Sequence, residues 1–552
     1  MILKGREFWS LLRFSALFLY VKIFIHKKLL STESKYDILV PRIKQKEEKM
    51  NNTRKIISLL LCGLISISAL AACSEPVEGP QGVAGVQGEK GDTGAQGEKG
   101  EKGDRGLRGE KGERGEDGTN GVDGKDGLTP YIGENGNWWL GDTDTGYGAT
   151  DAMLDFYPLP DGTYAVAVGK AKYLDKITVP DSYNGKAVTR ILEDGFSNCA
   201  ELTEITLPSG ITSIGSRAFA DCVKLKAIEL PSGVTSVGAA AFTGCVALES
   251  VKLPDGITKI ENDTFWGCEA LNNVTIPSSV TEIGGWAFCN CYALTEIIIP
   301  DNVTVLGNYA FSGCSELATL TLGAKVETID AMAFYACSKL TSVTIPDSVT
   351  RIGDSAFSEC TSLESISIGS GVESIGAEAF LYCSSLNSIT VSSENETYAG
   401  IDNCIVEKES GTLILGCKTS IIPADVKKIG DGAFYGCTHL EGITIPESVI
   451  SIGNDAFRDC AGIAQLVIPN GVTKIGSNAF RDCSALTQVS IGEDLASIGE
   501  NAFRGCVELT SVTFAQPDGW ETSEGEALDG LSNTATAAAY LTSTYRAYVW
   551  TR

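Results

Sequence analysis

One spacing dominates this sequence: a cysteine recurs every 23 residues, with a phenylalanine three residues before each cysteine. The cysteines lie at positions 199, 222, 245, 268, 291, 314, 337, 360 and 383, and again at 437, 460, 483 and 506. The unit reads C-x-x-L-x-x-I-x-I-P-x-x-V-x-x-I-G-x-x-A-F-x-x. A unit this short cannot bury its own apolar face, so the copies must stack on one another and share one continuous core.

The positions within the unit predict how each copy folds. The leucine and the two isoleucines at offsets 3, 6 and 8 from the cysteine are the inward residues of one short strand and of the bend before it. The proline at offset 9 ends this strand, because proline has no N–H to donate to a ladder. The V-x-x-I-G stretch forms a second extended segment, and Ala-Phe begins a tight turn back. The prediction is a repeat solenoid of short parallel strands with little helix.

The repeated phrase I-P-x-x-V-x-x-I-G-x-x-A-F-x-x-C resembles the BspA-like leucine-rich-repeat family, over about residues 180–514. Known members are bacterial and protist surface proteins, so the resemblance implies adhesion to host matrix proteins or to other cells. It brings no catalytic residue with it. Departures are mild: Gly323, Gly369 and Gly492 replace the proline, and Ser392 does so just before an insertion.

The repeats also set the expected boundaries of the folded part. We expect an N-terminal cap over residues 151–186, the solenoid over 187–514 and a C-terminal cap over 515–552. The gap between the cysteines at 383 and 437 is 31 residues longer than one repeat, which places an insertion at about residues 392–422.

A second repeat precedes the solenoid. Every third residue from 79 to 127 is glycine, the pattern of a collagen-like Gly-X-Y segment, because only glycine fits at the axis of three wound chains. Two interpretations remain: a stalk that forms a homotrimer, or a flexible spacer that does not trimerise. Residues 128–150 form a small Trp/Gly-rich module, similar to a segment that often follows such tracts in bacterial surface proteins.

The start of the chain looks like a targeting signal. Residues 50–72 have the charged start and apolar stretch of a signal peptide, ending in Leu-Ala-Ala before Cys73. This ending resembles the lipobox of bacterial lipoproteins, which implies lipidation of Cys73, with residues 73–78 as the lipid-anchored tether. An ordinary cleaved signal is the alternative. Residues 1–49 are interpreted as a mis-assigned start or, alternatively, as an extra N-terminal segment.

The cysteines are predicted to form an inward column of free thiols, because thirteen of them occupy one equivalent position per coil. Cys404 and Cys417 lie outside this column, in the insertion. If Ser410-Gly411 is a two-residue turn, the two cysteines oppose each other across a hairpin, and a disulfide between them is a hypothesis.

A candidate binding ridge follows the phenylalanine column. The position directly after each phenylalanine carries aromatic residues and then arginines, namely Trp266, Tyr335, Tyr435, Arg458, Arg481 and Arg504. Such residues often anchor interfaces, and three arginines in line suit a sulfated or carboxylated partner. The alternative is that Asp459 and Asp482 neutralise two of them.

Composition limits the remaining function classes. The net charge of −26 opposes binding to nucleic acid. With two histidines in 552 residues and no catalytic, cofactor or metal motif, we expect no enzyme, no cofactor and no metal. The predicted function is a surface lipoprotein that contacts the membrane through its lipid only, outer membrane if the cell is Gram-negative. Its solenoid would bind a host matrix or cell-surface protein, or an anionic glycan; the alternative is a structural rod without a dedicated ligand.

Overall fold

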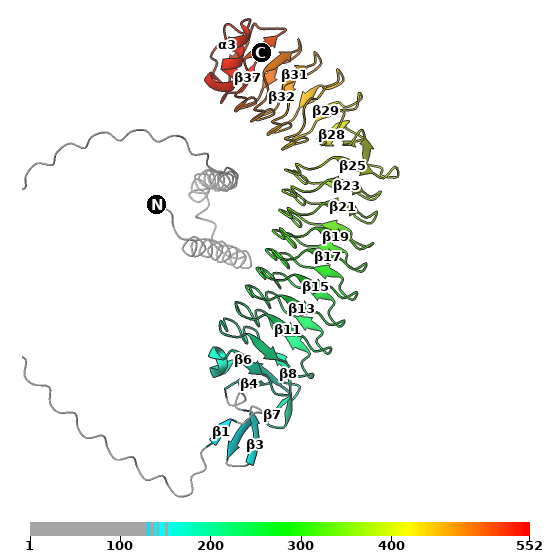
Figure 1. Ribbon diagram of the computed structural model, residues 1–552. Helices are drawn as coiled ribbons and strands as arrows, with labels where there is room; N and C mark the ends of the chain where they lie inside the picture. The colour runs from blue at the N-terminus through cyan, green and yellow to red at the C-terminus, as the bar shows by residue number, and fades with distance from the viewer. Residues whose placement is uncertain (1–129, 133–136, 141–142, 149–152) are drawn as a thin grey trace, which may run out of the picture. The chain divides into compact units, whose positions relative to one another are not determined.

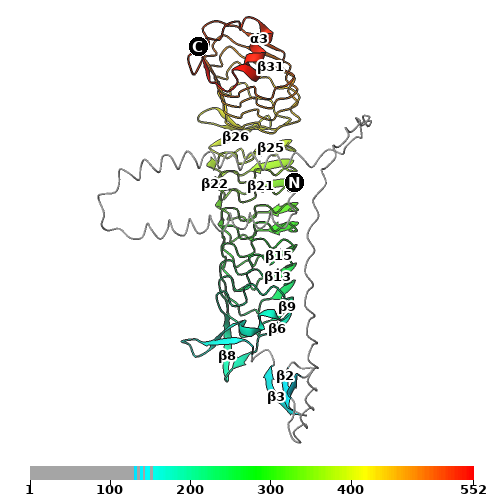
Figure 2. The same ribbon diagram turned by 90° about the vertical axis from the view of Figure 1, so that its left-hand side faces the viewer.

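The computed structural model describes residues 130–132, 137–140, 143–148 and 153–552. The predictions for residues 1–49, 50–72, 73–78 and 79–127 lie outside these residues. In the described part, about 15 coils with a spacing of ~23 residues form a β-solenoid with little helix, as predicted. Figures 1 and 2 show successive coils stacked on one another.

A small antiparallel sheet forms within residues 128–150. Its strand order is β1-β2-β3, with β1 at Pro130–Ile132, β2 at Asn137–Leu140 and β3 at Thr143–Gly148. The register of β2 and β3 shifts between Asn137 and Trp139.

The first extended segment of most coils adds a three- or four-residue strand to a parallel ladder, which is divided into separate sheets of two or three strands. In the three-residue strands the middle residue faces the core and its two neighbours face outward, which confirms the predicted alternation. The coil at Ile443 and Ile445 contributes no strand to this ladder. The strands are β9 (Glu204–Thr206), β11 (Ala227–Glu229), β13 (Ser250–Lys252), β15 (Asn273–Thr275), β17 (Glu296–Ile298), β19 (Thr319–Thr321), β21 (Ser342–Ile345), β23 (Ser365–Ile368), β25 (Ser388–Val391), β31 (Gln465–Ile468), β33 (Gln488–Ile491) and β35 (Ser511–Phe514).

The second extended segment builds a ladder of two-residue parallel strands, again as predicted, which is interrupted between Val237 and Lys259 and at the insertion. In most coils its second residue is the buried isoleucine or valine that precedes the repeat glycine. These strands are β10 (Ser213–Ile214), β12 (Ser236–Val237), β14 (Lys259–Ile260), β16 (Glu282–Ile283), β18 (Val305–Leu306), β20 (Thr328–Ile329), β22 (Arg351–Ile352), β24 (Ser374–Ile375), β29 (Lys428–Ile429), β30 (Ser451–Ile452), β32 (Lys474–Ile475) and β34 (Ser497–Ile498).

The phenylalanines form two stacked columns inside the solenoid, from Phe196 to Phe380 and from Phe434 to Phe503. Neighbouring rings are nearly parallel, with centroids 5.0–5.6 Å apart. This spacing lies in the favourable range for aromatic pairs. Because the 23-residue period returns each ring to the same place, every coil supplies one layer of the column.

The cysteines lie beside the phenylalanines as buried free thiols. In most coils the thiol donates a hydrogen bond to the backbone carbonyl of the phenylalanine in the preceding coil, as Cys314 does to Phe288 at 3.2 Å. The column therefore joins coils through sulfur–backbone contacts as well as through packing. Burial raises the pKa of Cys360 and Cys506 to about 12, which keeps these thiols protonated and unreactive.

Two backbone positions in each turn adopt left-handed dihedral angles, two residues before and two residues after the phenylalanine. Around Phe457 these are Asp455 (φ 51°) and Asp459 (φ 60°). Glycine, asparagine and aspartate tolerate this region best, and several coils use them. In other coils the first position holds bulky residues, including Trp286 (φ 54°) and Tyr309 (φ 59°).

The insertion forms three antiparallel strands between the two phenylalanine columns: β26 (Tyr398–Ile401), β27 (Cys404–Glu407) and β28 (Thr412–Leu415). Along β27, Ile405 joins the core on the N-terminal side of the insertion, whereas Cys404 and Val406 join the core on its C-terminal side. The period of two in a strand thus lets one hairpin face both parts of the solenoid.

The predicted register of this hairpin is wrong. The turn is not Ser410-Gly411 alone, because Glu407 pairs with Thr412 and residues 408–411 form a four-residue loop. A bulge between Ile405 and Val406 then shifts the pairing, so that Ile405 opposes Leu415. Cys404 pairs with Ile401 of β26, and Cys417 lies in a turn beyond β28. Both are free thiols in the structure, and both lie beside Ser420. The disulfide between them stays a prediction, but it no longer rests on the register of the hairpin.

Gly416 follows β28 where the second phenylalanine column begins, and a Cβ there would overlap the ring of Phe434. Phe434 is fully buried and stacked on Phe457 at 5.0 Å, so its ring has no room to move. We expect Gly416→Ala to lower the free energy of unfolding by about 1–3 kcal/mol, measured as a shift of the urea midpoint. Gly442→Ala is the matched control, because nothing lies within 4 Å of its Cβ position. Equal midpoints for the two variants would contradict the packing described here.

Both ends of the solenoid are covered. At the N-terminal end β8 pairs with β10 and continues the two-residue ladder, and β6 pairs with β9 and continues the longer one. At the C-terminal end β37 pairs antiparallel with β34, and Trp520 and Trp550 are buried. The elements of the two ends are β4 (Asp155–Pro158), β5 (Tyr164–Ala167), η2 (Gly169–Tyr173), β6 (Lys176–Thr178), β7 (Ser182–Tyr183), β8 (Lys186–Ile191), β36 (Glu521–Thr522), α3 (Thr534–Ala539), η3 (Tyr540–Thr544) and β37 (Trp550–Thr551).

Candidate functional site

We call the residues directly after the column phenylalanines the turn ridge. Each follows a buried ring by one position, so the fold places all of them in one row at the turns of successive coils. Their exposure differs: Trp266 and Arg504 are exposed, whereas Tyr335, Tyr435, Arg458 and Arg481 are half-buried. The row exists as a geometric feature, but its members are not equally accessible to a partner.

The exposed aromatic part of the turn region is larger than the sequence indicated. Trp286 and Tyr309 stand two residues before their phenylalanines, and their rings stack at 5.1 Å with an angle of 7°. Trp286 is 40% exposed and Trp266 in the preceding coil is 36% exposed. Between residues 153 and 552 these are the two exposed tryptophans. The sequence feature that could have predicted this pair is the presence of aromatic residues at the same repeat position in two consecutive coils.

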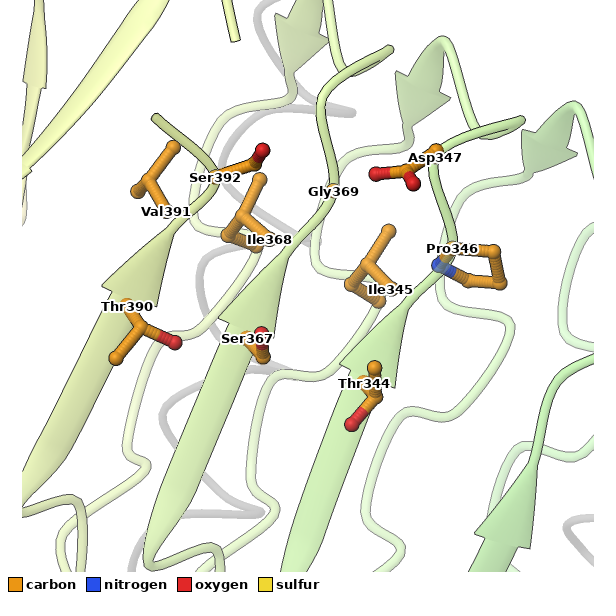
Figure 3. A pocket seen from close by; sticks show the side chains of 10 residues that line it. All are labelled: Thr344, Ile345, Pro346, Asp347, Ser367, Ile368, Gly369, Thr390, Val391 and Ser392. Carbon is orange, nitrogen blue, oxygen red and sulfur yellow. The ribbon is translucent and has the colours of Figure 1, made fainter. Parts of the chain in front are cut away.

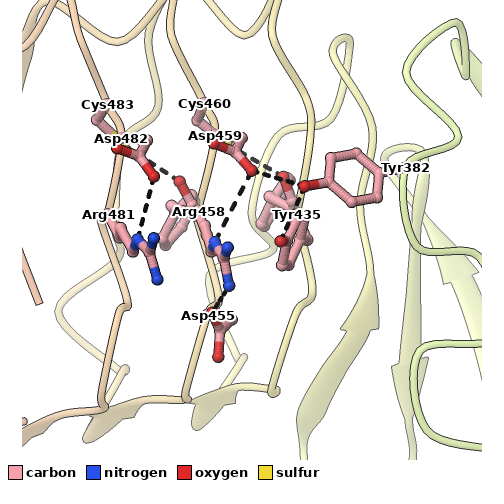
Figure 4. Close-up of polar contacts among 11 residues, drawn as sticks. Tyr382, Tyr435, Asp455, Arg458, Asp459, Cys460, Arg481, Asp482 and Cys483 are labelled. Carbon is pink, nitrogen blue, oxygen red and sulfur yellow. Dashed lines mark hydrogen bonds and ion pairs between the residues drawn. The ribbon is translucent and has the colours of Figure 1, made fainter. Parts of the chain in front are cut away.

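Two arginines of the turn ridge have acidic partners. Arg481 pairs with Asp482 as the alternative interpretation predicted, whereas the nearest partner of Arg458 is Asp455 and not Asp459. Arg458 Nη1 donates to Asp455 Oδ1 at 3.0 Å, and its Nε lies 3.8 Å from Asp459 Oδ2 (Figure 4). Arg481 Nε donates to Asp482 Oδ2 at 3.1 Å. Both arginine side chains are three-quarters buried and already paired, so little of their charge is available to an external anion.

Tyr382, Tyr435 and Asp459 form a polar network across the insertion (Figure 4). The Tyr382 hydroxyl donates to Asp459 Oδ2 at 3.0 Å and lies 3.0 Å from the Tyr435 hydroxyl. Arg458 lies over the Tyr435 ring, 5.1 Å from its centroid. Burial raises the pKa of Tyr382, Tyr435 and Asp459. The network therefore joins the coil before the insertion to two coils after it, although the buried Nε of Arg458 has no hydrogen-bond partner among the described residues.

Of the remaining turn-ridge residues, Tyr335 has an internal hydrogen-bond partner and Arg504 does not. The Tyr335 hydroxyl donates to Glu359 Oε1 at 2.6 Å, which holds this side chain on the solenoid. The Arg504 side chain makes no hydrogen bond or ion pair with any described residue. Arg504 is therefore the ridge arginine whose charge is open to solvent.

A shallow hollow of about 360 Å³ lies at the carboxyl ends of β21, β23 and β25 (Figure 3). It forms where Gly369 and Ser392 replace the repeat proline, so two pyrrolidine rings are missing from the row. The hydroxyls of Thr344, Ser367 and Thr390 line it. Its one carboxylate, Asp347, accepts the Ser370 N–H at 2.7 Å, and this bond lowers the pKa of Asp347.

No group of three or more histidine, cysteine or carboxylate side chains among the described residues has an arrangement that could hold a metal ion. Among the same residues, no helix has the length and apolarity that crossing a membrane requires.

The stacked coils define a leucine-rich-repeat solenoid, and comparison with known families gives the particular type. The model of the BspA type leucine rich repeat region matches residues 170–295, 287–400 and 415–520. These ranges cover more than half of the chain, which therefore belongs to the BspA-type leucine-rich-repeat family. The collagen triple helix repeat model matches residues 77–137, so the chain also carries a collagen-like segment.

Several solved structures are similar to this chain. A leucine rich cell surface protein from Faecalibacterium prausnitzii A2-165 is 28% identical, covering 67% of this chain and 95% of that chain, with a TM-score of 0.43. A leucine-rich repeat protein from Bacteroides ovatus ATCC 8483 is 26% identical, covering 65% and 92%, with a TM-score of 0.42. The T. pallidum leucine rich repeat protein is 24% identical over 38% and 88%, with a TM-score of 0.28. No curated protein matches the sequence.

Proposed function

We propose that this chain is a surface-exposed bacterial lipoprotein that mediates adhesion by binding a partner protein through the turns of its solenoid. The observation that carries the proposal is the pair of exposed tryptophans, Trp266 and Trp286, in adjacent coils. Tryptophan is enriched at binding hot spots because it offers a large rigid contact area.

The outward face of the strands is a poorer binding surface than the turns. Their outward residues are mostly serine, threonine and glutamate, and the exposed Ile298 and Val467 stand alone on separate strands. Scattered apolar side chains are normal on a protein surface and do not mark an interface. The turns around Trp286 and Tyr309 are therefore the better binding surface.

The proposed attachment comes from the first part of the chain. Lipidation at Cys73 would hold the protein at the membrane, in the outer membrane if the cell has one, and the Gly-X-Y segment would hold the solenoid away from it. At ~3.1 Å per residue a fully wound stalk of this length spans roughly 150 Å. A homotrimer formed through the stalk would present three solenoids together and raise avidity.

The charge distribution favours a protein over an anionic glycan. The chain carries a net charge of −26, and of the three ridge arginines only Arg504 lacks an acidic partner among the described residues. A single exposed arginine is a weak anchor for a polyanion. No role in catalysis is proposed.

The test is binding of the full-length protein, purified in detergent, to host matrix proteins, glycosaminoglycans and neighbouring bacteria. We expect saturable binding to a protein, weakened at least tenfold in the double variant Trp266→Ala/Trp286→Ala and changed less than about twofold in Arg504→Glu. Other coils already have alanine at these two repeat positions, Ala220 and Ala240, so the double variant should fold.

Two other outcomes would contradict the proposal. Glycosaminoglycan binding that is lost in Arg504→Glu would make the partner an anionic glycan. No binding to any member of the panel would support the alternative of a structural rod without a dedicated ligand.

A further inference from the structure

Asp263 carries a charge that the described part of the chain does not compensate. It stands two residues before Phe265, in the left-handed conformation (φ 59°). Its carboxylate makes no hydrogen bond or ion pair with any described residue. Desolvation by burial raises its pKa to about 6. Aspartates at the same repeat position have partners, since Asp194 pairs with Arg217 and Asp455 pairs with Arg458.

The next two coils place aromatic rings in line with Asp263. The backbones run in register, because Asp263 N–H donates to Gly285 O and Trp286 N–H donates to Asn308 O, each at 2.9 Å. Trp286 therefore stands one coil beyond Asp263, and Tyr309 one coil further. Because Tyr309 covers one face of the Trp286 indole, the opposite face is turned toward the coil that carries Asp263.

Trp266 brings a second indole to the same place. Its indole lies against the thiol of Cys289 in the next coil, and the charge of Asp263 acts on the same thiol. Burial is the main reason that the pKa of Cys289 rises to about 12, and the Asp263 charge adds to it. The Asp263 carboxylate and the Trp266 indole thus both act on the thiol of Cys289.

We propose that Asp263, Trp266 and Trp286 form a cation site that binds an arginine side chain of a basic partner protein. A guanidinium group can pair with a carboxylate and stack on an indole at the same time, which an ammonium group does less well. The inference rests on the proposed function, because it names the chemistry of the partner. The net charge of −26 agrees with it, since an acidic body attracts basic proteins.

The residue type at this left-handed position varies between coils. Some coils hold Gly432, Asn478 or Asn501 here, whereas others hold the longer Arg217, Met332 or Glu378. Trp286 and Tyr309 occupy two consecutive coils at this position and expose one indole. Neither the fold nor the repeat requires aromatic residues there.

The test is isothermal titration calorimetry, which measures the dissociation constant of an amidated tetra-arginine peptide from the full-length protein. We expect Asp263→Asn to weaken binding about tenfold or more and Trp286→Ala about threefold or more. Asn478 and Ala240 occupy the same position in other coils, so both variants should fold. Asp194→Asn is the matched control and should bind as the wild type does, because its carboxylate already has a partner. Asp263→Asn should also melt no earlier than the wild type, since it removes an unpaired, desolvated charge.

Several results would overturn the site. These are absence of peptide binding by the wild type, equal binding by Asp263→Asn, or an equal loss in Asp194→Asn, which would indicate general attraction to an acidic protein. Failure of the proposed function is distinguishable. If the protein adheres to nothing in the panel but loses peptide affinity in Asp263→Asn, the cation site stands without the adhesion. If it adheres and Asp263→Asn changes neither measurement, the adhesion stands without the cation site.

Discussion

Phe311→Ala is expected to lower the free energy of unfolding by about 3–5 kcal/mol. The Phe311 ring is fully buried and lies between Phe288 at 5.1 Å and Phe334 at 5.3 Å, so its removal leaves a cavity between two layers. The neighbouring rings are held by their own coils and cannot collapse into the space. Urea unfolding followed by circular dichroism measures the loss.

Two comparisons make the Phe311 prediction specific to the column. Phe380 ends the first column and stacks on one ring, Phe357 at 5.5 Å, so Phe380→Ala should cost less than Phe311→Ala. Val467 is 65% exposed, and Val467→Ala should change the free energy of unfolding by less than about 0.5 kcal/mol. If Phe311→Ala unfolded at the same urea concentration as Val467→Ala, the column would not be the source of stability.

Trp550→Ala is expected to have a loss of similar size, about 3–5 kcal/mol, at the C-terminal end. Trp550 is 1% exposed, packs near Phe514 and Trp520, and donates its indole N–H to Tyr545 O at 3.1 Å. It also lies in β37, the strand that covers the edge of β34. Its loss should therefore expose the last coils as well as remove buried area.

Hydrogen exchange locates this effect. Since each coil contacts only its neighbours, Trp550→Ala should reduce protection in residues 465–552 and leave residues 202–368 unchanged. Thr551→Ala, at an exposed neighbouring position in the same strand, is the control. Unchanged protection near the C-terminus of Trp550→Ala would mean that this segment does not act as a cap.

The period of 23 residues was enough to predict the solenoid because it fixes which side chains face inward. The leucine, the isoleucines, the phenylalanine and the cysteine return to the same place in every coil, and no other arrangement buries all of them. The two ladders, the phenylalanine columns and the free thiols follow from this repetition. The replacement of proline at Gly369 and Ser392 was visible in the sequence, whereas the hollow that results was not.

The features that were missed depend on backbone angles and on individual partners. The register of β27 and β28 depends on a bulge between Ile405 and Val406, and no residue type in this segment predicts a bulge. Asp263, Trp286 and Tyr309 lie in line because each occupies the left-handed position two residues before its phenylalanine. The sequence does not reveal that this position is left-handed. The position of the turn-ridge arginines could be predicted from the repeat. Whether Arg458 and Arg481 are paired could not, because pairing depends on the rotamers that bring Asp455 and Asp482 within 3.1 Å of them.

The most direct test of the central claim is adhesion of bacteria that display the full-length protein to immobilised matrix proteins. Cells that carry Trp266→Ala/Trp286→Ala should adhere at the level of cells without the protein, although both forms reach the surface in equal amounts by antibody labelling. Adhesion of the double variant equal to the wild type would contradict binding through the turns of the solenoid.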